Sequence, residues 1–225
     1  MTNQDGIFDE RVASHYEAWY ETPEGERADA LEKALLGRLL ERFPGGGSAL
    51  EIGCGTGHFT RWLDAQGLAS VGLDLSAPML VQAQALDGHP LVHGDGYRLP
   101  FADGSFDLVV MITTLEFLER PRQALAEALR VGRNGVLFGV LNRCSILGVQ
   151  RRLAGLFEET VYDAAHFYAA GELKRLAGSV AGEQARIAWH TTLFPRWCPW
   201  TEAGFPWGGF IGMALMVDQG LEERG

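Results

Sequence analysis

Cysteine, positive charge and long apolar runs are all scarce in this chain of 225 residues. The three cysteines, Cys54, Cys144 and Cys198, form no C-x-x-C pair, so neither a disulfide framework nor a zinc site is expected. An isolated cysteine is more often a small buried hydrophobic residue than a nucleophile or metal ligand. No apolar run approaches the roughly 20 residues that a membrane-spanning helix needs.

The charge balance is acidic. Lys and Arg number 19 against 29 Asp and Glu, which gives a formal net charge of −10. Nucleic-acid binding depends on clustered basic residues, so this balance disfavours a nucleic-acid partner. Residues 1–6 have neither a basic region nor an apolar core, so we expect no secretion signal and a cytoplasmic location. The length suits a single domain, and both a monomer and a homodimer remain open.

What the chain does have is a glycine-rich stretch, Ala49-Leu-Glu-Ile-Gly-Cys-Gly-Thr-Gly-His58. A short apolar segment precedes the glycines, and apolar residues at helical spacing follow them, so the stretch predicts strand, loop and helix. Glycines allow positive φ and let a ligand approach the bare backbone, and the start of the helix favours an anionic group. The spacing G-x-G-x-G differs from the G-x-G-x-x-G of dinucleotide-binding folds, and the Lys-Ser/Thr of a P-loop is missing.

Acidic residues follow the next two apolar segments. Asp74 lies near the end of segment 71–75, and Asp95 comes shortly after segment 91–93. In nucleotide-binding α/β folds, an acid at the first of these places accepts hydrogen bonds from ribose hydroxyls. Asp95 by itself is equally well explained as a turn-forming residue.

Strand and helix patterns alternate along the chain, which predicts an α/β fold with a doubly wound, mostly parallel sheet. Ligands bind such sheets at the carboxyl ends of the strands. The residues that fall at those ends are Glu51, Gly53, Asp74, Asp95 and Thr113. Seven strands are expected, with a hairpin of the sixth and seventh forming an antiparallel edge: 48–52, 71–75, 91–93, 106–112, 134–141, 184–190 and 208–217.

Two motifs together resemble those of the class I S-adenosylmethionine (SAM)-dependent methyltransferases of the ubiquinone/menaquinone-biosynthesis-like type (methyltransferase type 11). Glu51-x-Gly53-x-Gly55-x-Gly57 is similar to motif I of that class. Gly94-Asp-Gly-Tyr-Arg-Leu-Pro-Phe101 is similar to its Gly-Asp-(x)3-Leu-Pro-Phe signature. The resemblance covers residues 8–141 well and 166–176 loosely.

The resemblance implies a Rossmann-like fold with a small cap, SAM as the cofactor, S-adenosylhomocysteine as its product, and in-line methyl transfer to a small-molecule acceptor. Within a single domain of residues 1–225, it places N-terminal helices that form a lid at 8–43 and the SAM-binding core at 48–141. A substrate cap would occupy 142–170, and the C-terminal part of the sheet 171–217. Phe8 to Tyr20 predicts a helix with Phe8, Val12, His15/Tyr16 and Trp19 on one face. A lid and a plainly packed helix are both open for this segment. Arg27 to Arg42 predicts an amphipathic helix whose buried stripe is Ala28, Leu31, Ala34/Leu35 and Leu39.

By the same resemblance, Glu51 binds the methionine ammonium, Asp74 the ribose and Asp95 the adenine amine. The residues expected to bind the cofactor are Tyr16, Tyr20, Glu51, Gly53, Cys54, Gly55, Gly57, Asp74, Leu75, Met79, Asp95, Gly96 and Thr113. In the cap, Arg143, Arg151 and Arg152 either hold an acidic group of the substrate or are solvated.

A hydroxyl acceptor needs a general base, whereas a thiolate, amine or carbanion needs none. Glu116 and His166 are the candidate bases, with His15 third. Many relatives have histidine at the position of Glu116, and this departure keeps a non-catalytic SAM-binding protein open as an alternative. An RNA or protein methyltransferase is disfavoured by the acidic charge, and a nicotinamide dehydrogenase by the glycine spacing. No metal is expected.

Overall fold

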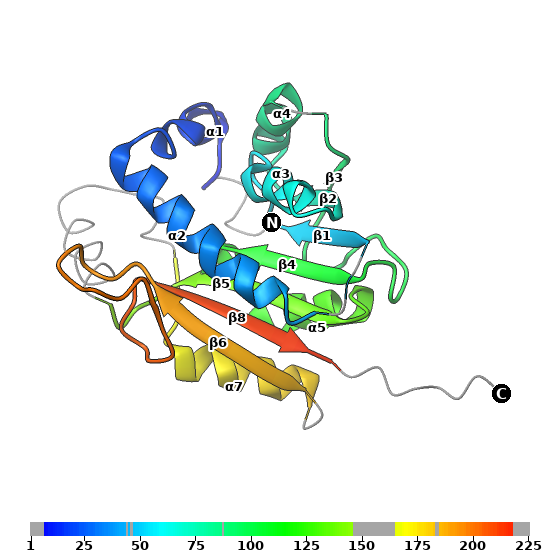
Figure 1. Ribbon diagram of the computed structural model, residues 1–225. Helices are drawn as coiled ribbons and strands as arrows, with labels where there is room; N and C mark the ends of the chain where they lie inside the picture. The colour runs from blue at the N-terminus through cyan, green and yellow to red at the C-terminus, as the bar shows by residue number, and fades with distance from the viewer. Residues whose placement is uncertain are drawn as a thin grey trace.

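The computed structural model describes residues 7–43, 45, 47–86, 88–145, 165–182 and 185–217. These described residues form a mixed sheet of eight strands with helices on both faces (Figure 1). The strands are β1 Ser48–Ile52, β2 Ala69–Asp74, β3 Leu91–His93, β4 Leu108–Ile112, β5 Gly135–Leu141, β6 Arg186–Thr192, β7 Glu202–Ala203 and β8 Phe210–Met216. The α-helices are α1 Glu10–His15, α2 Pro23–Leu40, α3 His58–Ala65, α4 Ala77–Leu86, α5 Pro121–Val131 and α7 Ala170–Ala181, and the 3₁₀ helices are η2 Glu17–Trp19 and η3 Leu115–Phe117.

The order of strands in the sheet is β3-β2-β1-β4-β5-β8-β6-β7. Strands β1 to β5 pair in parallel, which confirms the predicted doubly wound α/β fold. From β1 the chain adds β2 and then β3 on one side, and it then adds β4 and β5 on the other side of β1. The strand order therefore switches between β1 and β4. Ligands of such folds bind at this switch point, outside the carboxyl ends of the strands.

The antiparallel side of the sheet is present and has one strand more than expected. Strand β8 pairs antiparallel with β6, as expected of the last two segments, and also with β5, so it lies inside the sheet. The edge is formed by β7, a two-residue strand that adds an eighth to the seven expected. The inner place of β8 agrees with its sequence, because six of its seven residues are buried, as in a strand covered on both faces.

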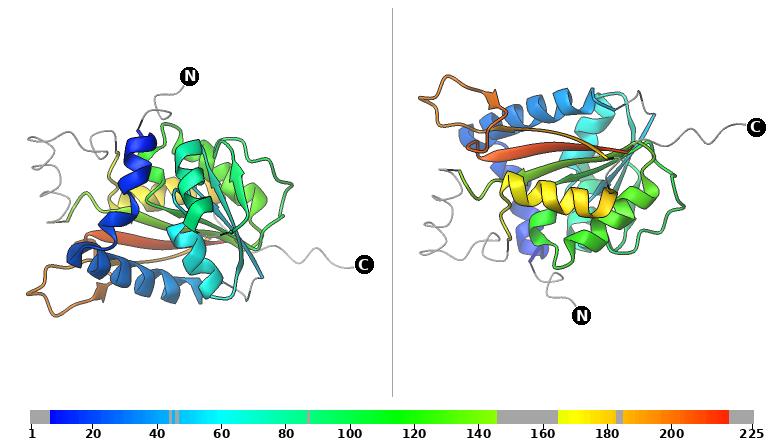
Figure 2. Two further views of the ribbon diagram at one scale, coloured as in Figure 1. Left: turned by 90° about the horizontal axis from the view of Figure 1, so that it is seen from above. Right: turned by 90° about the horizontal axis from the view of Figure 1, so that it is seen from below.

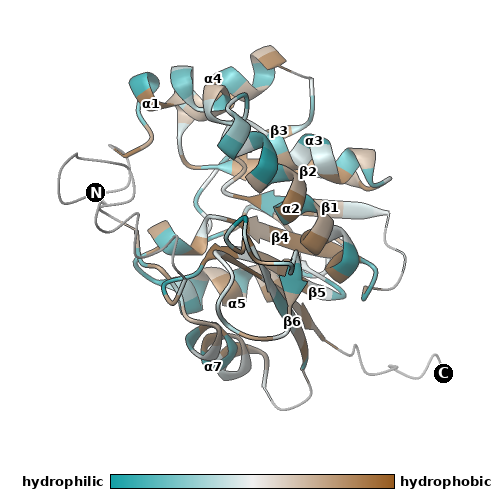
Figure 3. Cartoon of the chain, turned by 60° about the vertical axis from the view of Figure 1, so that its left-hand side comes forward, coloured by the Kyte–Doolittle hydropathy of each residue, from teal (hydrophilic) through white to brown (hydrophobic). Residues whose placement is uncertain are grey.

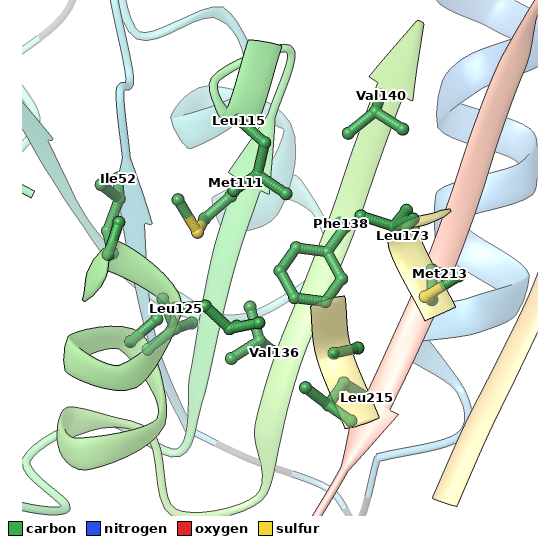
Figure 4. Packing of buried hydrophobic residues seen from close by; sticks show 14 of the residues in the cluster. Ile52, Met111, Leu115, Leu125, Val136, Phe138, Val140, Leu173, Met213 and Leu215 are labelled. Atoms are coloured by element: carbon green, nitrogen blue, oxygen red, sulfur yellow. The ribbon is translucent and has the colours of Figure 1, made fainter. Parts of the chain in front are cut away.

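Two layers of helices cover the sheet. Helices α2 and α3 pack on one face, and α5 and α7 pack on the other (Figure 2). On the second face, Phe138 of β5 lies between Leu125 of α5 and Leu173 of α7 (Figure 4). The central strand β4 is uniformly apolar, as its colour in Figure 3 shows, because it is buried between both layers. This rigid centre fixes the strand ends that form the site.

The N-terminal segment is not the continuous helix expected over 8–20. It divides into α1 and η2 at Tyr16. Asp9 caps α1 by accepting a hydrogen bond from the Val12 N–H at 2.9 Å. The Ser14 hydroxyl donates to the Arg11 carbonyl at 3.0 Å, a side-chain bond that competes with the helix ladder and bends helices.

The expected substrate cap is described only at its two ends, 142–145 and 165–170, and Arg151 and Arg152 lie outside the described residues. Arg143 forms an ion pair with Glu172 of α7 at 3.3 Å. Across the described ranges, none of the helices combines the length and the apolar character that crossing a membrane requires.

Candidate active site

The glycine loop joins β1 to α3 in a conformation that needs its glycines. Gly53, Gly55 and Gly57 have φ values of 73°, 55° and 80°. A Cβ on Gly53 would come within 2.4 Å of the Thr114 side chain, so only glycine fits there. The Gly53 N–H donates to the Leu73 carbonyl at 2.7 Å, which holds the loop against β2.

A cavity of about 310 Å³ lies at the carboxyl ends of the parallel strands, beside this loop. Its volume is at the lower end of the range for small-molecule sites. Ile52 at the end of β1 and Thr113, the residue after β4, both contribute to it, and the strand order switches between these two strands. The lining residues are Ile7, Phe8, Tyr16, Ile52, Gly53, Gly55, Leu73, Asp74, Leu75, Ser76, Ala77, Pro78, Met79, His93, Gly94, Asp95, Gly96, Thr113, Thr114, Phe117 and Leu118.

Asp74 is one of the two carboxylates in this lining. Its Oδ2 accepts from the Gly55 N–H at 2.7 Å, and its Oδ1 accepts from the Ser76 N–H at 2.8 Å. Burial raises the pKa of the Asp74 carboxyl, although these backbone bonds oppose the shift. An ionised carboxylate offers about four lone-pair sites. Asp74 therefore keeps capacity to accept hydrogen bonds from two neighbouring hydroxyls.

Asp95 and Met79 lie farther along the same cavity. The Asp95 Oδ1 accepts from the Tyr97 N–H at 2.8 Å, so the residue does form the turn that its sequence context allowed. It also lines the cavity, so the turn is compatible with ligand contact. Met79 is 2 % exposed and offers an apolar surface to the cavity from α4.

Thr113, just after β4, has the unusual φ of 48°. Positive φ is strained for a β-branched residue and persists only where the surroundings enforce it. The Thr113 N–H donates to the Gly139 carbonyl at 2.7 Å, which anchors this backbone to β5. Such strain concentrates at functional sites, in agreement with the place of Thr113 in the cavity wall.

Most residues expected to bind the cofactor line this cavity. They are Tyr16, Gly53, Gly55, Asp74, Leu75, Met79, Asp95, Gly96 and Thr113. The expected residues that the lining does not include are Tyr20, Glu51, Cys54 and Gly57. The sequence reasoning missed Phe8, His93 and Phe117, which belong to the lining. Phe117 lies in η3, the short helix that comes after the end of β4, so its place after a strand end was the available signal.

Glu51 faces the interior and not the cavity. It is 2 % exposed, and its Oε2 accepts a hydrogen bond from the Thr60 hydroxyl of α3. Burial raises the pKa of the Glu51 carboxyl to about 8. Cys54 is buried too, against Gly72 of β2, and burial raises the pKa of its thiol. The contact of Glu51 with a ligand ammonium stays a prediction, and its position supports a role in joining β1 to α3.

Tyr20 belongs to a charged network that ties η2 to the glycine loop. Its ring stacks on His58 with 3.7 Å between centroids and an interplanar angle of 8°. The His58 Nε2 lies 2.7 Å from the Asp29 Oδ1. Glu17 of η2 accepts a hydrogen bond from the Thr56 hydroxyl and forms an ion pair with Arg61 at 3.1 Å.

These contacts shift the pKa values of Glu17 and His58. Burial opposes ionisation of Glu17, yet its hydrogen bonds to His58 and Thr56 hold its pKa at about 2. Burial likewise opposes the charged form of His58, and its bonds to Asp29 and Glu17 outweigh burial and raise its pKa. The network therefore favours a charged His58 between two carboxylates.

Neither candidate base lines the cavity. Glu116 is 1 % exposed, and its Oε1 accepts from the Leu141 N–H at 2.6 Å. The His166 Nε2 lies 2.7 Å from the Glu172 Oε1 on α7. Both side chains thus make contacts that hold the fold, and a role for either as a base stays a prediction that its position does not favour.

A second chamber of about 310 Å³ adjoins the first cavity. The two share Phe8, Tyr16, Thr113 and Phe117. The remaining lining consists of Val12, His15, Trp19, Tyr20, Glu32, Phe59 and Leu141. The face predicted from Phe8, Val12, His15/Tyr16 and Trp19 is therefore the face that lines this chamber.

Glu32 was missed by the sequence reasoning. The buried stripe expected on the second helix contained Ala28, Leu31, Ala34/Leu35 and Leu39. The structure buries Ala28, Glu32, Leu35, Leu36 and Leu39. A glutamate at helical spacing between Ala28 and Leu39 was the signal, because a charged residue in a buried stripe is uncommon.

Known proteins resemble this chain in sequence. Residues 50–140 match the family described as "Methyltransferase domain". An uncharacterized protein of Methanocaldococcus jannaschii is 33% identical over 63% of this chain and 64% of its own length. A malonyl-[acyl-carrier protein] O-methyltransferase of Erwinia billingiae is 41% identical over 45% of this chain and 41% of its own. An 18S rRNA (guanine-N(7))-methyltransferase of Schizosaccharomyces pombe is 33% identical over 41% and 36%. The chain thus spans less than two thirds of the length of these relatives.

A solved structure matches nearly the whole chain. It is a SAM-dependent methyltransferase from Thermotoga maritima, described as a possible histamine N-methyltransferase. The two chains are 28% identical, with a TM-score of 0.79 over 95% of this chain and 99% of the other. The fold is that of a doubly wound α/β domain with a cavity at the carboxyl ends of its parallel strands. Residues 50–140 belong to the class I SAM-dependent methyltransferases of type 11, and SAM is the cofactor of this domain.

The residues present fit this cofactor. Asp74 has acceptor capacity for ribose hydroxyls, the glycine loop exposes bare backbone, and Met79 offers an apolar face. When bound, SAM supplies an electrophilic methyl group on a sulfonium centre.

Proposed function

We propose that the protein is an enzyme that transfers the methyl group of SAM to a small-molecule acceptor and releases S-adenosylhomocysteine. The observation that carries this proposal is the second chamber, which shares Thr113 and Phe117 with the cofactor cavity. An acceptor held there lies next to the cofactor, and positioning of two reactants alone contributes roughly 7–11 kcal/mol to such reactions. The cytoplasmic location expected from the sequence is part of this proposal.

The dimensions and charge of the molecule support a small acceptor. A chamber of about 310 Å³ has room for a small organic molecule. The net charge of −10 disfavours an extended contact with RNA, in contrast to the acceptor named for the yeast relative. A protein-borne acceptor, as named for the Erwinia relative, needs a path for its carrier arm, whereas a free metabolite does not.

A labelled-methyl screen tests the proposal. The protein is incubated with methyl-labelled SAM and a metabolite extract, and label is followed in low-mass, protein and RNA fractions. We expect protein-dependent label in the low-mass fraction, and much less with Asp74→Ala, which impairs cofactor binding. Label confined to RNA or protein would overturn the small-molecule acceptor. Tight SAM binding without transfer to any fraction would favour a non-catalytic SAM-binding protein.

A further inference from the structure

We infer that the second chamber binds an acceptor that carries an amine, and that Glu32 is the residue that selects it. The chamber is the one of about 310 Å³ between α1, η2, α2 and the end of β4. This inference rests on the proposed function, because it names the acceptor class of the same reaction.

The place of Glu32 sets the electrostatic character of the chamber. It lies in α2, is 5 % exposed and contributes to the chamber wall. Among the described residues of that wall, Glu32 is the acidic one and none is Lys or Arg. Charges interact more strongly inside a protein than in water, so a carboxylate here attracts a cationic head group and repels an anionic one.

The aromatic side chains around Glu32 add to this preference. The Tyr16 and Tyr20 rings meet at 6.1 Å between centroids and the Trp19 and Tyr20 rings at 5.0 Å, both edge to face. Aromatic faces attract ammonium groups by roughly 0.5–2 kcal/mol, depending on how far the pair is desolvated. Burial first, then the neighbouring Tyr16 and Glu32, raise the pKa of the Tyr20 hydroxyl, so it stays neutral beside the amine.

The basic side chains near Glu32 have contacts of their own. Lys33, its neighbour on α2, forms an ion pair with Asp29 at 2.8 Å. His58 stacks on the Tyr20 ring and contacts Asp29 and Glu17. His15 lines the chamber from α1, and its Nδ1 lies 3.0 Å from the Arg11 carbonyl.

Glu32 also provides a destination for the amine proton. An ammonium that enters the chamber passes one proton to the Glu32 carboxylate and becomes a neutral amine. Its nitrogen lone pair forms the new C–N bond while the C–S bond breaks, the electron pair stays on sulfur, and the positive charge moves from sulfur to nitrogen. Glu32 then releases its proton to solvent, so the net reaction yields the methylated ammonium, S-adenosylhomocysteine and one proton.

A matched series of probes tests the inference: 2-phenylethylamine, 2-phenylethanol and phenylacetate, which share a ring and differ in their head groups. Binding to the protein saturated with S-adenosylhomocysteine is measured by calorimetry. We expect the amine to bind at least tenfold more tightly than the alcohol and phenylacetate not to bind. In Glu32→Gln, the amine should lose this advantage while the alcohol keeps its affinity, and Glu26→Gln, an exposed change on the same helix, should behave as the wild type.

Several results would overturn the inference: equal or tighter binding of the alcohol or the acid, no binding by any probe, or an amine preference that persists in Glu32→Gln. Because Glu32 is buried, the variant is accepted only if it unfolds cooperatively and binds S-adenosylhomocysteine as the wild type does; otherwise the wild-type probe series alone decides. Methyl transfer to a non-amine metabolite in the labelled screen would overturn the amine and leave the proposed function intact. Loss of all transfer would overturn the proposed function itself.

Discussion

At the residue scale, Asp74 and Glu51 show how similar carboxyl groups on adjacent strands come to serve different purposes. Asp74 lies at the end of β2, where its two oxygens accept from backbone N–H groups and still face the cavity. Glu51 lies inside β1, where the Thr60 hydroxyl is its partner and burial raises its pKa to about 8. Position along the strand decides which one a ligand can reach.

Replacing Asp74 by Ala should weaken SAM binding by more than tenfold, because hydrogen bonds to an ionised group contribute about 1.5–3 kcal/mol each. Calorimetry with SAM and S-adenosylhomocysteine measures the loss. Since Asp74 also holds the Gly55 and Ser76 N–H groups, an analogue without ribose hydroxyls serves as the control. If the variant weakens this analogue as much as the parent ligand, the ribose contact is refuted.

Replacing Glu51 by Gln should make stability less dependent on pH. The folded-state pKa of about 8 lies above the unfolded value of 4.5, so between these values the folded state binds more protons. The contribution of Glu51 to the free energy of unfolding therefore falls as pH rises through that window. Above pH 8 the ionised carboxylate is buried, and the destabilisation is complete. Gln carries no such charge and avoids this loss.

Urea unfolding at pH 6 and pH 9 measures this difference. When the pH is raised from 6 to 9, the free energy of unfolding of Glu51→Gln should rise relative to that of the wild type by at least about 1.4 kcal/mol, which corresponds to one pKa unit. Glu119→Gln, which makes the same substitution at an exposed position, is the matched control. Parallel pH profiles for Glu51→Gln and the wild type would contradict the buried, protonated carboxyl.

At the scale of elements, the N-terminal segment is held over the strand ends by side chains and not by a continuous helix. Glu17 of η2 reaches Thr56 in the glycine loop and Arg61 in α3. Phe8 packs on Phe117 of η3 with 5.0 Å between ring centroids. The segment thus contributes to both cavities at once, and its attachment depends on charges.

Replacing Glu17 by Gln should loosen this segment. Hydrogen exchange of the α1 and η2 amides should become about tenfold faster, while exchange in β4 and β5 stays unchanged, because the ion pair with Arg61 and the contact with His58 are lost. Glu21→Gln, an exposed change next to η2, should leave exchange as in the wild type. Unchanged exchange in Glu17→Gln would show that packing alone holds the segment.

The same network predicts the direction of a pH effect. The folded-state pKa of His58 is raised above its unfolded value, so its stabilisation is complete below the unfolded value and lost as pH rises through the folded one. Glu17 behaves in the opposite way, because its pKa is lowered to about 2 and its contribution is lost only as pH falls toward that value. The attachment should therefore weaken on the alkaline side.

At the scale of the whole molecule, the sheet brings the carboxyl ends of the five parallel strands β1 to β5 to one side, and both cavities form there. The two helical layers pack densely on this sheet, so the strand ends are rigid while the N-terminal segment covers them (Figure 2). A ligand that binds this side contacts several elements at once, and its binding energy adds to the stability of the whole fold.

SAM should therefore stabilise the protein as a unit. At a concentration 100 times its dissociation constant, a ligand that binds only the folded state adds about 2.7 kcal/mol to the free energy of unfolding. For a chain of this length, such a gain raises the Tm by roughly 5–11 °C, which differential scanning fluorimetry detects. S-Adenosylhomocysteine should act in the same way and NAD should have no effect; a Tm shift with NAD alone would refute the cofactor assignment.

Much of the cofactor site could be predicted from the sequence because its determinants are local. The glycines are needed for positive φ wherever the loop lies, and an acid at a strand end reaches the ligand edge of any parallel sheet. For this reason Gly53, Gly55, Asp74 and Asp95 were found from motif and spacing. The same reasoning missed that Glu51 and Glu116 face inward. Glu51 lies in β1, where burial of four of the five residues leaves no periodicity to distinguish it, and Glu116 lies in η3, which is too short to show one.

The sequence by itself determined the order of strands and helices, the glycine loop and the strand-end acids, because each follows from local backbone preference and hydrophobic pattern. Only the tertiary structure decided that β8 lies inside the sheet, that η2 is tied to the glycine loop, and that Glu32 of α2 meets the aromatic face of α1 and η2. These contacts join residues far apart in the chain, and their geometry depends on how the helical layers pack against the sheet.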